Sequence, residues 1–298
     1  MAAEAVTTVG ARPGNRVLAR WRRRFAASPW AAAAEMAARL GYMARGAVYL
    51  STGLMALLAV ARVIPHPHSP IRGLQTWAHW PLGVVLLWVT GLGLYGFAGW
   101  RALQSIFDAD RQGASLKALG SRVGQALSGV IYGGLAVSVF GVIDTLHDLR
   151  HAEIEKTSDR IAGVMAWPLG VVVVMALGLF ILACGAGNAI RAFVDDFGGT
   201  LKCDVTVRRW AQRIARLGYF GRGAAMLPVG FFILRAGWHE RAQEARGVGG
   251  ALWALHGLAG GDLVLALMGL GMIAFGVFGF VEAWYRPIRP EGAFSDLI

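Results

Sequence analysis

Three charged residues lie inside long apolar stretches of this sequence, where a charge is costly. Arg45 and Arg222 lie near the start of two such stretches, and Glu282 lies near the end of the last one. Because charges inside a bilayer are rare and often functional, these residues are the first candidates for chemistry. Glu282 could form a buried ion pair with Arg45, Arg222 or Arg286, or the arginines could extend to the headgroups. A path for protons or anions is the alternative.

A second set of residues could bind a metal ion. All 7 histidines fall between the apolar stretches, on the side expected to face outward. His147 and His151 are four residues apart, which would place both imidazoles on one face of a helix. His66 and His68 flank a proline in another loop. Because imidazole suits zinc, copper and nickel, these four residues are the metal candidates, and a role as polar loop residues is the alternative.

No other signature of catalysis or cofactor binding is present in the sequence. It contains no glycine-rich phosphate loop, no Gly-x-Ser-x-Gly nucleophile turn and no pair of histidines within an apolar stretch. Cys184 and Cys203 are the two cysteines, and their positions indicate neither a disulfide framework nor a metal site. We therefore expect a protein that is not an enzyme and that uses no cofactor.

The apolar stretches that position these residues are long enough to cross a membrane. Hydrophobic residues make up 56% of the chain and charged residues only 16%, a balance that favours contact with lipid. A membrane-spanning helix needs about 20 mostly apolar residues. The stretches that meet this requirement are Tyr42–Ile64, Pro81–Trp100, Val123–Ile143, Pro168–Asn188, Leu217–Ala236 and Gly261–Val281. The predicted fold class is therefore an all-α integral membrane protein with six transmembrane helices.

The net charge of +11 could indicate nucleic-acid binding, but the distribution of basic residues indicates membrane topology instead. With six spans, 19 Lys and Arg residues fall on the side of the two termini and 8 on the opposite side. By the positive-inside rule, both termini are expected in the cytoplasm. The expected partner is the lipid bilayer, including anionic lipids at the basic N-terminal arm, and no nucleic acid.

The six stretches form three similar pairs. The first member opens with Arg39-Leu40-Gly41-Tyr42, Arg122-Val123-Gly124-Gln125 or Arg216-Leu217-Gly218-Tyr219. The second opens with Trp80-Pro81-Leu82-Gly83, Trp167-Pro168-Leu169-Gly170 or the weaker match Gly260-Gly261-Asp262-Leu263. Since each pair starts and ends on the cytoplasmic side, the repeats are parallel helical hairpins with pseudo-threefold symmetry. The predicted units are a basic arm (1–38), three repeats (39–109, 121–196 and 215–286) and a cytoplasmic tail (287–298).

Small residues recur at equivalent positions of the repeats, about two helical turns apart. Such residues allow helix backbones to approach closely in lipid. We therefore expect tight helix interfaces at these positions, and a glycine-lined permeation path is the alternative. The expected packing positions are Gly46, Gly53, Gly129, Gly133, Gly223 and Gly230 in the first helices, and Gly91, Gly178, Gly269 and Gly276 in the second helices.

The repeated motifs resemble the Domain of Unknown Function 1206 family of bacterial membrane proteins. The resemblance rests on the Gly-Tyr-x-x-Arg-Gly openings at 41–46 and 218–223, on the Pro-Leu-Gly starts and on two Gly-Leu-Gly segments, at 91–93 and 269–271. It covers residues 39–286, although the middle repeat has Gln125 and Ser128 where the others have Tyr and Arg. The family implies three tandem two-helix units and a location in the bacterial inner membrane, and it implies no reaction.

The leading functional hypothesis is a structural or interaction role without catalysis. The alternative is transport of a small solute or an ion along the central axis, with Arg45, Arg222 and Glu282 near its inner mouth. A polar, water-accessible axis would favour transport, and a close-packed axis would favour the structural role.

The predicted topology can be tested by labelling single cysteines in intact cells, with Cys184 and Cys203 replaced by serine. Arg72→Cys and Glu153→Cys should react with an impermeant maleimide, because both positions lie in outward loops. Lys117→Cys should be protected until the membrane is permeabilised. Labelling of Lys117→Cys alone would overturn the assignment of the two sides.

Overall fold

In the computed structural model, the described residues form helices and turns and contain no strand. The structure describes residues 29–64, 70, 74, 77, 80, 82–107, 115–145, 157–256 and 258–288. The long helices are α2 (Pro29–Val60), α4 (Gly83–Phe107), α5 (Leu116–Thr145), α7 (Gly170–Val194), α8 (Val205–Trp238) and α10 (Gly261–Tyr285). Each contains a segment that is long and apolar enough to cross a membrane. The six-span, all-helical expectation is confirmed.

Short helices precede two of the spans and were not predicted. These short helices are α6 (Thr157–Met165) and α9 (Val248–His256). The described residues also form two 3-10 turns, η2 (Gly198–Thr200) and η3 (Ala242–Glu244). Helices of two to three turns show too little periodicity to stand out in a sequence. Helix α8 also starts earlier than expected, because the Asp204 side chain accepts a hydrogen bond from the Thr206 backbone and caps the helix.

Turns of the same geometry start α7 and α10. Leu169 and Gly260 precede these helices with a left-handed backbone, at φ 64° and 76°. The next residues, Gly170 and Gly261, pass so close to the preceding short helix that a Cβ would lie 1.9 Å and 1.8 Å from a carbonyl oxygen of α6 and α9. The glycine that starts these second helices is therefore required by a close backbone approach.

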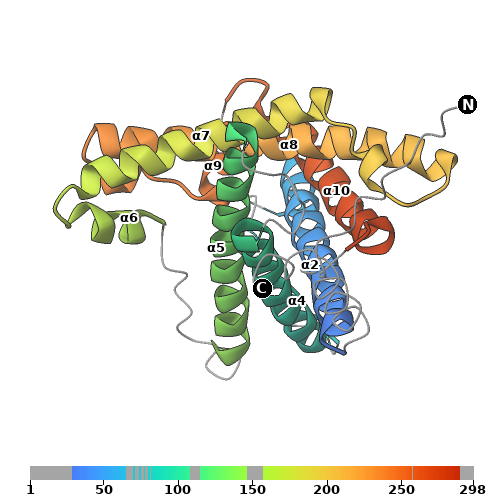
Figure 1. Ribbon diagram of the computed structural model, residues 1–298. Coiled ribbons are helices and arrows are strands. Elements are labelled where there is room, and N and C mark those ends of the chain that lie inside the picture. Colours follow the sequence, from blue (N-terminus) through green and yellow to red (C-terminus); the bar gives the residue numbers. More distant parts are fainter. Residues whose placement is uncertain are drawn as a thin grey trace, which may run out of the picture.

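The long helices pack in an order that follows the repeat. Three equivalent interfaces join the first helix of one repeat to the second helix of another, namely α2–α10, α5–α4 and α8–α7. Interfaces within a repeat join α2 to α4 and α8 to α10. Helices α5 and α7 of the second repeat form no extended interface within the described residues, and α7 crosses the top of α5 in Figure 1. The second repeat is thus open where the other two are closed hairpins.

In all three interfaces between repeats, the helices cross at the same two positions of the repeat, one on the first helix and one on the second helix. In each, a Cβ on a glycine of the first helix would lie very near a carbonyl oxygen of the facing helix. The glycine and the residue that it faces are Gly46 and Gly276 (2.8 Å), Gly223 and Gly185 (2.6 Å), and Gly129 and Ala98 (3.3 Å). The approach is looser where the facing residue is alanine, because its methyl group holds the helices apart.

The other expected packing positions also lie against neighbouring helices. A Cβ on Gly53 would lie 2.6 Å from the Gly269 carbonyl oxygen, and one on Gly230 would lie 3.0 Å from that of Gly178. These contacts are the second crossing, two turns beyond the first. The remaining two positions are Gly91 and Gly133, on which a Cβ would lie 2.8 Å from the Phe140 ring and 3.7 Å from the Ala98 Cβ, respectively.

Equivalent arginines join the helix ends on the side of the termini. Arg39 of α2 donates hydrogen bonds to the carbonyl oxygens of Ala283 and Trp284 at the end of α10. Arg122 of α5 donates in the same way to the last turn of α4, at 2.7 and 2.8 Å. The last carbonyl groups of a helix lack intrahelical partners and carry partial negative charge. The repeated arginines therefore satisfy the ends of the second helices.

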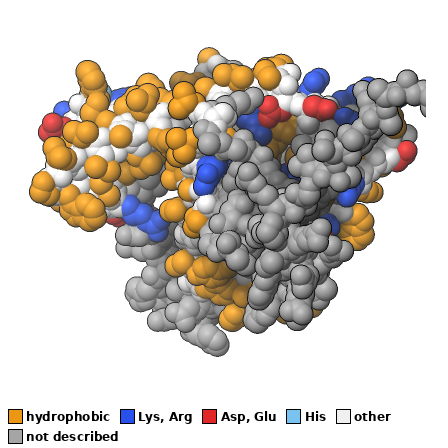
Figure 2. Space-filling model, in the orientation of Figure 1, with side chains coloured by type: hydrophobic (Ala, Val, Ile, Leu, Met, Phe, Trp, Pro, Cys, Tyr) orange, Lys and Arg blue, Asp and Glu red, His pale blue; other side chains and the backbone are white. Residues whose placement is uncertain are grey.

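Side chains that face away from these interfaces are largely apolar. Figure 2 shows hydrophobic side chains gathered over α7, at the left of the view. Exposed members of this helix include Val172, Val173, Leu179, Phe193 and Val194. A soluble protein rarely exposes such a continuous apolar surface, and a bilayer would cover it with lipid.

The tight crossing at Gly223 can be tested by substitution. Gly223→Leu is expected to lower the melting temperature in detergent by several degrees, since its Cβ would lie 2.6 Å from a carbonyl oxygen of α7. Overpacking of this kind costs about 1–3 kcal/mol. Gly187→Leu, at a position of α7 with no neighbouring atom within 4 Å of the Cβ, is the matched control and should melt like the unmodified protein. Equal melting of both variants would contradict the tight interface.

Candidate functional site

Equivalent turns of α2 and α8 each direct a tyrosine and an arginine toward the bundle interior. The segment Tyr42-x-x-Arg45 of α2 matches Tyr219-x-x-Arg222 of α8. Residues three apart lie on one face of a helix, so each arginine stands next to its tyrosine. Tyr42 is fully buried and Tyr219 is 7% exposed. The glycine that follows each arginine forms the helix crossing described above, and it brings the arginine close to the facing helix.

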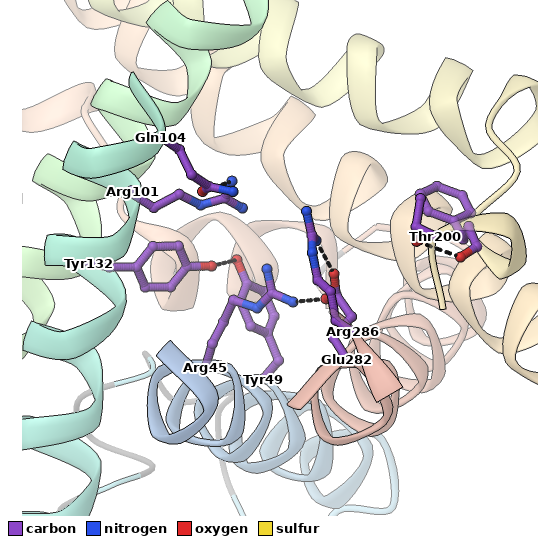
Figure 3. A network of polar contacts seen from close by, with 9 residues as sticks. Arg45, Tyr49, Arg101, Gln104, Tyr132, Thr200, Glu282 and Arg286 are labelled. Atoms are coloured by element: carbon purple, nitrogen blue, oxygen red, sulfur yellow. Dashed lines mark hydrogen bonds and ion pairs between the residues drawn. The ribbon is translucent and has the colours of Figure 1, made fainter. Parts of the chain in front are cut away.

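Arg45 forms a buried ion pair with Glu282 of α10 (Figure 3). The Nη2 atom of Arg45 donates to Oε2 of Glu282, and Nη1 of Arg286 donates to Oε1 of the same carboxylate at 2.7 Å. Arg45 is 2% exposed and Glu282 is 3% exposed. The pair links the first helix of repeat one to the last helix of repeat three. Of the alternatives that the sequence left open for Glu282, the structure selects Arg45 and Arg286 together.

Aromatic rings surround the Arg45 guanidinium. Its Cζ atom lies 5.1 Å from the ring centroids of Tyr42 and Phe97 and 5.0 Å from that of Phe275. These distances are within the range of cation–π attraction, which replaces part of the hydration that a buried cation loses. Arg45 is therefore held inside the bundle and does not extend to the headgroup region.

Arg222 has a different environment. Its Cζ atom lies 4.9 Å from the Phe275 centroid and 5.5 Å from that of Tyr49. Within the part of the chain that the structure describes, no carboxylate lies at ion-pair distance from Arg222. Its Nε atom is buried and has no hydrogen-bond partner there. Arg222 is thus not a partner of Glu282, although its position in the repeat is equivalent to that of Arg45.

Arg101 and Gln104 of α4 belong to the same site and were not predicted as site residues. The Nη1 atom of Arg101 donates to Oε1 of Gln104 at 3.1 Å, and Gln104 is 1% exposed. Figure 3 shows Arg101 and Arg45 extending their guanidinium groups toward the same region. The repeat itself held a signal, because Gln104 occupies the position in its repeat that Glu282 occupies in the third.

Two tyrosines fill the centre of the bundle. The hydroxyl oxygens of Tyr132 in α5 and Tyr49 in α2 lie 3.4 Å apart. Tyr49 packs edge-on against Phe275 at a centroid distance of 4.7 Å, and it contacts three of the buried hydrophobic clusters. The meeting point of the described helices is therefore occupied by aromatic side chains.

The four metal candidates, His66, His68, His147 and His151, all lie outside the described residues, so the metal hypothesis stays a prediction. Two other histidines are described, and each faces one carboxylate. The Nδ1 atom of His239 lies 2.9 Å from Glu244, and that of His256 lies 2.5 Å from Asp262. Across the described ranges, no group of three or more metal-ligating side chains is present.

The His239 contact ties η3 to the C-terminal end of α8. Arg235 of α8 also donates to Oε2 of Glu244, at 2.8 Å. Partial burial raises the pKa of Glu244, but the hydrogen bond from His239 and the positive charge of Arg235 outweigh it and hold the pKa below its ordinary value. Glu244 is thus a charged structural anchor for this turn.

The chain belongs to the family described as Domain of Unknown Function (DUF1206). The family matches residues 40–108, 123–195 and 217–286, which together make up more than half of the chain. The resemblance and the threefold repeat are thereby confirmed. The uncharacterized protein YxxB of Bacillus subtilis (strain 168) is 27% identical over 257 residues, which cover 85% of this chain and 91% of that protein. No solved structure matches the chain.

Removal of the buried carboxylate should reveal how strongly the site holds the bundle together. Glu282→Ala is expected to destabilise the protein in detergent by about 3–5 kcal/mol, because Arg45 would remain buried without a counter-charge. Arg286→Ala should cost less, since the Arg286 side chain keeps 25% of its surface exposed. Thermal unfolding of the purified variants measures both effects.

Double variants assign the partner. Arg45→Ala combined with Glu282→Ala should be markedly non-additive, because either change alone breaks the same pair. Arg222→Ala combined with Glu282→Ala should come much closer to additivity. Equal coupling of Glu282 to both arginines would contradict the pairing described here.

Proposed function

We propose that this chain is a multi-pass protein of the bacterial inner membrane that acts without catalysis, as a structural or interaction module. The observation that carries the proposal is the interface between α2 and α10. There the backbones touch at Gly46 and Gly53, and the buried Arg45–Glu282 pair lies beside the first crossing. Transporters that alternate their access move one repeat against another. An interface held this closely supports a fixed arrangement of the first and third repeats.

The state of the buried carboxylate also supports a role without catalysis. A general acid or base needs a carboxyl group that can reach a substrate and exchange a proton with it. Both oxygens of Glu282 accept hydrogen bonds from arginines, and the residue is 3% exposed. Its contacts support the role of a structural counter-ion.

Cytoplasmic termini are supported by where the basic residues lie in the fold. Arg39 and Arg122 hold the ends of neighbouring helices together, and the exposed Arg208, Arg209 and Arg213 lie in the first turns of α8, before its apolar segment. An excess of Lys and Arg next to spans favours the cytoplasmic side. The same basic surface supports contact with anionic lipids.

Transport of an anion is the second candidate function. It is favoured by one observation, the presence of Arg101 and Arg222 inside the bundle without a described carboxylate partner. Positive charges inside a membrane protein often mark the path of an anion.

Flux measurements separate the two candidates. The full-length protein is reconstituted in liposomes loaded with labelled phosphate or chloride. If the proposal is correct, efflux should match that of protein-free liposomes, with and without a membrane potential. Efflux well above that background, lost in Arg222→Gln but not in Arg213→Gln, would overturn the structural role and favour transport.

A further inference from the structure

Positive charges outnumber negative charges at the centre of the bundle. Glu282 is the one buried carboxylate among the described residues, and it already serves Arg45 and Arg286. Arg101 lies close enough to Arg45 for their charges to repel one another. Arg222 and Arg45 both contact Phe275. The described part of this site is therefore short of negative charge, which is costly in a medium of low dielectric constant.

Hydrogen-bond donors are also left over at this site. The Nε atoms of Arg45, Arg101 and Arg222 are buried and have no partner within the described residues. Arg101 and Arg222 are only half-buried, so both keep surface that a ligand can reach. Buried polar groups in native structures are nearly always satisfied. Unused donors on three guanidinium groups indicate that an acceptor is missing from the described part of this site.

We propose that Arg45, Arg101 and Arg222 bind an oxyanion carrying a single phosphate group, next to the hydroxyls of Tyr49 and Tyr132. The planar guanidinium fork matches the oxygens of a phosphate and binds them with paired hydrogen bonds. A tyrosine hydroxyl adds a neutral donor to the same group. Each arginine comes from a different helix, so the bound anion would connect α2, α4 and α8.

The phosphate group belongs either to an anionic lipid or to the free ion. Two features favour a lipid headgroup. Arg101 lies in the last two turns of α4, at the end of the helix that the distribution of basic residues predicts on the cytoplasmic side. The missing extended interface between α5 and α7 leaves the described bundle open on one side, where a lipid can approach. Acyl chains would then cover the apolar surface of the spans.

The test uses the full-length protein purified in detergent and stripped of lipid. Melting temperature is measured with inorganic phosphate, with chloride at the same ionic strength, and in nanodiscs with or without phosphatidylglycerol in phosphatidylcholine. Native mass spectrometry measures the phospholipid that stays bound. At least one of the two phosphate sources, phosphatidylglycerol or inorganic phosphate, should raise the melting temperature. Arg101→Gln and Arg222→Gln should each weaken the apparent affinity of the protein for that source at least about tenfold.

Controls separate binding from folding. Arg222→Lys keeps the charge and should retain part of the binding, and Arg213→Gln, at an exposed position of the same helix, should bind as the unmodified protein does. Retention of phosphatidylglycerol without an effect of inorganic phosphate identifies the headgroup, and the reverse identifies the free ion. Equal stabilisation by chloride, no effect of either source, or an equal loss in Arg213→Gln would overturn the proposal. Binding requires no flux, so this proposal and the structural role can fail independently.

Discussion

The cost of placing a guanidinium group inside a membrane bundle is the constraint on which the centre of this structure depends. Arg45 is 2% exposed, so it needs a counter-charge and a polarisable surrounding within a few ångströms. Glu282 supplies the charge, and three aromatic rings supply the surrounding. Glu282 comes within reach because Gly46 lets α2 touch α10, and Phe97 comes close because Gly41 lets α2 approach α4. The glycine crossing and the ion pair are therefore one unit, since neither helix could approach so closely with a larger side chain at the crossing.

The threefold repeat shows how one framework carries different chemistry. The backbone contacts recur, with a glycine of the first helix against the facing helix in all three interfaces between repeats. The side chain at the Glu282 position does not recur, because the equivalent residues are Gln104 and Arg191. Gln104 bonds Arg101, and Arg191 pairs with Asp195 at 2.6 Å near the end of α7. A symmetric scaffold thus holds an asymmetric set of charges, and it concentrates arginines at its centre.

The second repeat is the exception in both sequence and structure. It has Gln125 and Ser128 where the others have the tyrosine and the arginine, so α5 contributes no cation at this turn. Its two helices also lack the extended interface that closes the other repeats, among the residues described. The buried Arg45–Glu282 pair lies between the first and third repeats, away from this open side.

Length, hydropathy and recurrence are local properties, and the sequence by itself therefore determined the six spans, the three repeats and the positions of Arg45, Arg222 and Glu282. It could not decide which arginine Glu282 binds, because three candidates lie at similar depth and the choice depends on how α10 rotates against α2. It also missed Arg101, Tyr49 and Tyr132, whose places in the site depend on contacts between helices far apart in the chain. Those contacts follow from the crossing points at the glycines, which only the tertiary structure brings together, because the closeness of two helices depends on both faces at once.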